Sequence, residues 1–205
     1  MRKGLLIVIS GPSGTGKGTV CEVVRKKNPD IAYSVSATTR AARPGEQDGV
    51  NYYFHTKEEF VAMINNGELL EWANVYGNYY GTPLKHIEEQ RAKGIDIILE
   101  IDTQGAMNVK EKCPDGLFIF LVPPSLEELK NRLCGRGTED DESLKRRLGS
   151  AIAEIEIGRQ YRYVVVNKTV DIAAEEITNI IEAERHRTDL NIEILDKLKN
   201  RKEIL

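Results

Sequence analysis

The sequence predicts an α/β fold in which helices flank a parallel sheet. Residues 5–9 and 117–122 are apolar runs of the length expected for buried strands, and the mainly apolar residues 95–101 are a further candidate. Helical stretches separate these runs, and a glycine-rich loop at residues 11–18 joins the first run to a helix. Strands that alternate with helices favour parallel pairing, because the chain must cross one face of the sheet between two parallel strands.

The composition is that of one folded domain without a polyanionic partner. Of the 205 residues, 40% are hydrophobic and 30% are charged, which is ordinary for a globular protein and unlike a disordered one. With 29 basic and 32 acidic residues the net charge is −3. This balance argues against nucleic-acid binding, although it allows a small basic pocket for one anionic ligand.

No segment has the sequence of a membrane span. A spanning helix needs about 18 consecutive apolar residues, and residues 5–9 are too few for the apolar region of a signal peptide. The cysteines, Cys21, Cys113 and Cys134, lack the spacing of metal ligands, so reduced thiols are expected. We therefore expect a soluble, cytoplasmic chain with neither a membrane nor a nucleic-acid partner.

In the first half of the chain, the local patterns predict three helices and one more strand. A capping box of Thr56 and Glu59 opens one of the helices. The predicted elements are a helix at 19–27, mainly loop at 36–51, a helix from 56 to about 65, a strand at 69–75, a turn at 76–81, and a helix that Thr82-Pro83 starts, with proline at its first position.

The second half continues the alternation. A second capping box, Ser125 and Glu128, opens a helix after the strand at 117–122. Beyond it we expect a helix at 139–158, a short strand at 163–166 and a helix at 172–186. Residues 182–205 hold six basic and six acidic side chains, which favours a solvated helix over a polybasic membrane anchor.

The sharpest motif is a phosphate-binding loop between a buried strand and a helix. Glycines let backbone N–H groups turn toward phosphate oxygens, and the helix N-terminus adds its positive dipole end. Lys17 is expected to reach the β- and γ-phosphates of a nucleotide. The alternative is a glycine-rich turn without a ligand. The motif reads Gly11-Pro12-Ser13-Gly14-Thr15-Gly16-Lys17-Gly18-Thr19.

The motif departs from the usual pattern directly after the lysine. That position normally carries a Ser or Thr hydroxyl for Mg²⁺, but here it is Gly18. We expect Mg²⁺ to be held mainly by phosphates and water, as is common for this ion. Thr19 and Asp102 are the candidate protein ligands.

Further motifs resemble those of the guanylate kinases, in the same order along residues 5–167. The resemblance implies a P-loop parallel sheet with an inserted GMP-binding segment and a helical lid. The motifs are Ser36-Ala37-Thr38-Thr39-Arg40-Ala41-Ala42-Arg43-Pro44-Gly45-Glu46, Asn51-Tyr52-Tyr53-Phe54, Leu70-Glu71-Trp72-Ala73, Gly77-Asn78-Tyr79-Tyr80-Gly81-Thr82, Ile101-Asp102-Thr103-Gln104-Gly105 and the lid-like residues 132–147.

The resemblance implies transfer of the γ-phosphoryl group of ATP to GMP, with Mg²⁺. It implies that the guanidinium groups of Arg40 and Arg43, which can donate two hydrogen bonds at once, bind the GMP phosphate together with the hydroxyls of Tyr52 and Tyr80. It assigns the guanine to Ser36, Glu71, Thr82 and Asp102; a carboxylate such as Glu71 can accept from the amino group and ring N–H that distinguish guanine from adenine.

On the donor side, the resemblance implies that ATP lies on residues 11–19 and beside Asn167. It places the lid arginines Arg132, Arg136 and Arg147 on the transferring phosphoryl group, with Lys17. It divides one domain into a core (1–35, 83–133 and 159–205), a GMP-binding insertion at about 36–82 and a lid at about 134–158. ATP and GMP are the expected partners, with a homo-oligomer as a further expectation.

Simpler interpretations stay open beside these. Arg40, Arg43 and the lid arginines could be solvated surface charges, and strand alternation could place Glu71 in solvent. Glu100 and Asp102 share one strand face, and the role of Glu100 is left open. Two other functions are a kinase for a sugar phosphate, which would not need a guanine-reading carboxylate, and a scaffold domain, which would not need an intact phosphate loop.

Overall fold

The protein contains a five-stranded parallel sheet in the order β2-β7-β1-β8-β9, which confirms the predicted fold class. The computed structural model describes residues 2–75, 77–134 and 141–200, and the side chains of 141–147 and 200 are outside this description. The strands are β1 (Leu6–Ser10), β2 (Ala32–Tyr33), β7 (Ile97–Glu100), β8 (Leu117–Val122) and β9 (Tyr163–Val166).

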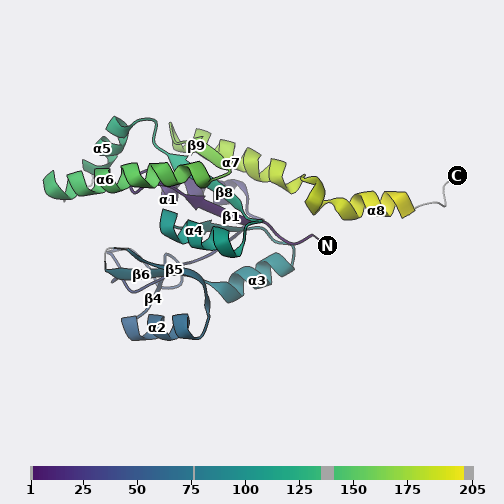
Figure 1. Ribbon diagram of the computed structural model, residues 1–205, viewed down its shortest axis with the longest axis horizontal. Coiled ribbons are helices and arrows are strands. Elements are labelled where there is room, and N and C mark those ends of the chain that lie inside the picture. Colours follow the sequence, from purple (N-terminus) through teal and green to yellow (C-terminus); the bar gives the residue numbers. More distant parts are fainter. Residues whose placement is uncertain (1, 76, 135–140, 201–205) are drawn as a thin grey trace.

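Helices cover both faces of this sheet (Figure 1), which explains why its central strands are apolar throughout. On one face, Ile7 and Ile9 pack with α1 (Lys17–Lys27) and α7 (Val170–Arg185). On the other face, Leu6 and Val8 pack with α3 (Leu84–Ala92) and α4 (Thr103–Lys112). The alternation along β1 therefore builds two cores, one on each side of the sheet.

A second sheet lies beside the first. It holds the motifs at residues 36–46, 51–54, 70–73 and 77–82, here called the acceptor motifs because the resemblance assigns them to the acceptor GMP. Its order is β4-β3-β6-β5, from β3 (Ala37–Thr38), β4 (Tyr53–Phe54), β5 (Leu69–Val75) and β6 (Asn78–Pro83). Helix α2 (Lys57–Asn65) packs against it through Phe60, on the side away from the large sheet (Figure 1). The predicted capping box is confirmed: Thr56 and Glu59 each bond the other's backbone N–H.

Two helices and a projecting tail complete the molecule. Helices α5 (Leu126–Cys134) and α6 (Asp141–Ile157) lie together at one end (Figure 1), where Leu129 and Leu133 pack with Ala151. A 3₁₀ turn (Gly158–Gln160) leads to β9, and a second one (Thr188–Leu190) follows α7. The expected tail helix is α8 (Ile192–Asn200), which extends away from the body in both views.

Two local predictions are wrong. Residues 76–81 were expected to form a turn, but β6 already begins at Asn78, because the chain from there to Pro83 pairs with β5. Pro83 is the last residue of β6 and precedes α3, so it is not the first helical residue. Helix α4 and the two-residue strands β2, β3 and β4 were not predicted. Within the described residues, no helix is long and apolar enough to span a membrane.

Candidate nucleotide-binding site

A cavity of about 410 Å³ lies where the carboxyl ends of β1 and β7 face the second sheet. Ligands of open α/β sheets bind at this edge. Its described lining comes from the phosphate loop, the acceptor motifs and the end of β7, with one residue from α6: Gly11, Ser13, Gly14, Thr15, Gly16, Lys17, Gly18, Thr19, Ser36, Tyr52, Glu71, Val75, Tyr80, Gly81, Glu100, Ile101, Asp102 and Glu154.

The phosphate loop is held in shape by its own contacts. Gly11, Gly14 and Gly16 have positive φ angles of 151°, 86° and 85°, a region that favours glycine. The buried Thr15 hydroxyl donates to the Pro12 carbonyl at 2.9 Å. Asn167, which follows β9, donates from Nδ2 to the Thr15 carbonyl at 2.7 Å. Asn167 therefore supports the loop through this hydrogen bond. It is not among the described residues that line the cavity.

Lys17 lies at the start of α1, and its ammonium is turned back over the loop. Its Nζ donates to the Gly11 carbonyl at 2.6 Å. Burial lowers the pKa of Lys17, and the carboxylates of Glu100 and Glu154 oppose this effect. The loop thus presents one cation to the cavity next to the N-terminus of α1, which suits a polyphosphate.

Glu71 is buried, with only 4% of its surface exposed, while its neighbour Trp72 is 41% exposed. The alternative that placed Glu71 in solvent is therefore wrong. The Thr82 hydroxyl donates to Glu71 Oε1 at 2.6 Å, and a side chain at Gly105 would put its Cβ 2.7 Å from Glu71 Oε2. Burial raises the pKa of Glu71 to about 7, and the Asp102 charge adds to the rise.

Two more carboxylates, on the last residue of β7 and two residues beyond it, face the cavity together, as their spacing predicts. Asp102 caps α4 by accepting from the Gly105 N–H at 2.9 Å. Glu100 accepts from the Tyr33 hydroxyl at 3.1 Å, and its Oε1 lies 3.5 Å from the Cβ that a side chain at Gly18 would have. Glu100 therefore borders the position where other phosphate loops carry a hydroxyl.

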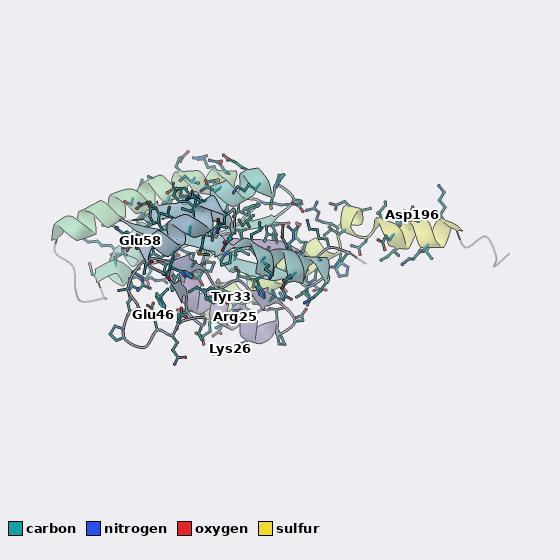
Figure 2. The ribbon with its side chains drawn as sticks, turned by 90° about the horizontal axis from the view of Figure 1, so that it is seen from below. Arg25, Lys26, Tyr33, Glu46, Glu58 and Asp196 are labelled. Atoms are coloured by element: carbon teal, nitrogen blue, oxygen red, sulfur yellow. The ribbon has the colours of Figure 1, made fainter. Side chains whose placement is uncertain are left out.

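The two arginines expected at the acceptor phosphate are not among the described residues that line the cavity. Arg40 Nη2 donates to both carboxylate oxygens of Glu46, at 2.9 and 3.0 Å, and its guanidinium lies 5.4 Å from the Tyr52 ring centre. Arg43 is exposed, and its backbone N–H donates to Glu46. Figure 2 shows Glu46 on the outer loop of this part of the molecule. The roles of both arginines stay predictions.

Of the lid arginines, the structure describes the side chain of Arg132. Its guanidinium donates to Glu128 at 2.8 Å, to the Thr15 carbonyl at 3.3 Å and to the Asn167 carbonyl at 3.2 Å. Arg136 lies outside the described residues, and Arg147 lies in α6 with its side chain outside them. Arg132 thus connects α5 to the phosphate loop.

Sequence reasoning missed Glu154, the residue of α6 in the cavity lining. Its carboxyl accepts a hydrogen bond from the Ser13 N–H, and burial raises its pKa although Lys17 opposes the rise. No local pattern identifies Glu154, because α6 also carries the exposed Glu156 two residues on.

Comparisons with known proteins agree with this geometry. The family model for guanylate kinase matches residues 3–184. A guanylate kinase of Halalkalibacterium halodurans is 55% identical over 93% of this chain and 94% of its own length, and one of Clostridioides difficile is 51% identical over 97% and 98%. The crystal structure of guanylate kinase from Anaplasma phagocytophilum is 37% identical, with a TM-score of 0.83 over 100% of this chain and 98% of that one. The chain therefore belongs to the guanylate kinase family.

Proposed function

We propose that this protein transfers the γ-phosphoryl group of ATP to GMP, giving ADP and GDP, and so serves purine nucleotide metabolism. The observation that carries the proposal is the shared cavity: the buried Glu71 and the loop with Lys17 both line it. A carboxylate that can bind guanine and a loop that can bind the phosphates of ATP therefore face the same cavity. The reaction joins two anions, so positioning and charge stabilisation are its main requirements.

On the acceptor side, Glu71 accepts hydrogen bonds from the ring N–H and amino group of guanine. Ser36, Thr82 and Asp102 complete the base site, with Thr82 holding Glu71 in place. A site built to hydrogen-bond these groups rejects bases that lack them, because the buried polar groups are then left unpaired. Tyr52 and Tyr80 donate to the GMP phosphate, and Arg40 and Arg43 join them.

The GMP phosphate needs no general base, because it is largely dianionic near neutral pH. Its oxygen attacks the γ-phosphorus of ATP, whose phosphates lie on residues 11–19. Lys17 and the arginines Arg132, Arg136 and Arg147 stabilise the charge of the transferring group. Closure of the lid and of the acceptor segment excludes water, which would otherwise hydrolyse ATP.

Mg²⁺ is the proposed cofactor, and the oxygen ligands of the cavity suit it. Glu100 and Asp102 offer carboxylates beside the phosphate loop, and Thr19 offers a hydroxyl. Among the described residues, no cluster of three or more His, Cys, Asp or Glu could hold a metal. Mg²⁺ commonly binds through phosphates and water with few protein ligands. When bound, Mg²⁺ neutralises phosphate charge.

We further propose the division into a core (1–35, 83–133 and 159–205), a GMP-binding insertion (36–82) and a lid (134–158). The four-stranded sheet supports the insertion, because its strands all lie between Ala37 and Pro83. A cytoplasmic location and a homo-oligomer stay predictions. Helix α8 exposes Ile194 and Leu198, and light scattering on the purified protein tests self-association.

The direct test is a coupled ADP-release assay with ATP and Mg²⁺. GMP, AMP, UMP, CMP and ribose phosphates are offered as acceptors in parallel. We expect turnover with GMP alone. Turnover with only a sugar phosphate would overturn the base-recognition argument, and no turnover by the folded protein with any acceptor would favour a binding module.

A further inference from the structure

Glu154 brings a negative charge from the lid side to the phosphate loop. Within the part of α6 whose side chains are described, it is the residue that lines the cavity. Its carboxyl accepts from the Ser13 N–H, and it lies close enough to Lys17 for the two charges to interact. A single carboxylate therefore engages a loop N–H and faces the loop cation.

These two groups are what a nucleotide phosphate requires. A phosphate-binding loop works by directing backbone N–H groups and one lysine at phosphate oxygens. The Glu154 carboxylate therefore occupies hydrogen-bond donors that a nucleotide phosphate would otherwise use. A phosphate brought beside Glu154 would also meet its negative charge, and like charges at close range repel.

The packing of α6 fixes Glu154 at this position. Ala151, three residues earlier on the same helix face, is buried against Leu129 and Leu133 of α5. The loop in turn lies against α5, since a Cβ at Gly14 would be 2.7 Å from Leu133 Cδ2. The loop, α5 and α6 are thus in contact; Arg132 reaches the loop from α5, and Glu154 is the carboxylate that reaches it from α6.

We propose that Glu154 is a positioning residue that holds the phosphate loop before nucleotide binds and must release Ser13 when ATP arrives. It therefore lowers the affinity of the donor site. The inference rests on the proposed function, since it assumes that ATP lies on residues 11–19.

Calorimetric titration with ADP tests this inference on the wild-type protein and on E154A and E154Q. The control is E156Q, because Glu156 lies on the same helix, is exposed and pairs with Arg159 at 2.7 Å. We expect E154A to bind ADP about tenfold more tightly, as for loss of one charge-assisted hydrogen bond that competes with the ligand. E154Q should bind more tightly too, and E156Q should match the wild type within about twofold.

A kinetic measurement separates this role from a merely structural one. In E154Q the KM for ATP should fall and the KM for GMP should not, whereas general damage to the fold would raise both. Unchanged or weaker ADP binding in both Glu154 variants would overturn the inference and leave the proposed function intact. Failure of the folded wild-type protein to bind ADP would overturn both.

Discussion

The Thr82 hydroxyl donates to the buried Glu71 carboxylate at 2.6 Å, and the two residues are partners across β5 and β6. The pairing of β5 with β6 therefore positions the Glu71 carboxylate, the group proposed to bind the guanine base. Because Glu71 is buried, this hydrogen bond gives only part of the solvation that its charge needs, and its pKa is raised to about 7.

The first prediction concerns the pH dependence of stability. The folded protein keeps a proton on Glu71 up to a pKa of about 7, whereas the unfolded chain releases it near the ordinary value of 4.5. The folded state therefore binds more protons between these values, so the free energy of unfolding falls as the pH rises through this window. The full contribution is about 3 kcal/mol. Urea unfolding at pH 5 and pH 8 measures it.

Two variants isolate this effect. E71Q cannot ionise and should lose the contribution, so its stability should fall less between pH 5 and pH 8. E58Q is the control, since Glu58 is exposed on α2 (Figure 2) and should keep the wild-type profile. An E71Q profile that parallels the wild type would contradict the assignment. Binding of GMP near pH 6.5 should also release the proton from Glu71, because the N–H donors of guanine require an ionised carboxylate as acceptor.

The second prediction is that Lys17→Ala abolishes turnover and leaves the fold intact. Lys17 makes its hydrogen bonds to loop carbonyls and carries the loop's positive charge, so its loss removes charge stabilisation from the reaction. We expect kcat to fall at least about 100-fold, as for other single groups that stabilise a transition state. The coupled assay and a thermal melt give activity and folding together.

The matched control lies on the same helix. Lys26 of α1 is exposed (Figure 2) and pairs with Glu22, so Lys26→Ala should retain full activity. Substantial turnover by the Lys17 variant would reject its role in the reaction.

The sequence identifies the large sheet and the loop because both have local signals. The strands β1, β7 and β8 are buried on both faces and are mainly apolar, and the loop glycines have a fixed spacing. Strand β2 has two residues, too few for any pattern. Strand β6 was missed because Tyr79, Tyr80 and Gly81 look like a turn until β5 is present to pair with them.

In the candidate site, too, residues in local motifs could be predicted, whereas contacts between distant parts of the chain could not. Family motifs mark Glu71, Thr82 and Asp102, but burial and partners depend on elements far apart in the chain. Glu154 contacts a loop near the other end of the sequence, so no local pattern contains it. The pairing of Arg40 with Glu46 depends on the path of the loop between them, which composition does not determine.

The third prediction concerns Arg40. If its fork engages the GMP phosphate, Arg40→Lys should raise the KM for GMP about tenfold, because a lysine ammonium does not reproduce a bidentate fork. The KM for ATP should stay unchanged. Arg159→Lys is the control, since Arg159 is exposed and pairs with Glu156. Equal effects of both substitutions on the KM for GMP would remove Arg40 from the acceptor site.

The fourth prediction separates two costs of adding a methyl group to a glycine. Gly11 and Gly45 both have positive φ, at 151° and 88°, so alanine strains the backbone at either position. At Gly45 nothing lies within 4 Å of the added Cβ, whereas at Gly11 the Cβ would lie 2.1 Å from the Leu121 carbonyl oxygen. Since Leu121 lies in β8 and pairs with Val165 of β9, this oxygen cannot move aside without disturbing the sheet. Gly45→Ala should therefore cost about 1 kcal/mol of unfolding free energy, and Gly11→Ala about 3 kcal/mol or more. Urea unfolding of the two variants measures the difference, and equal losses would show that backbone strain alone explains glycine at the start of the phosphate loop.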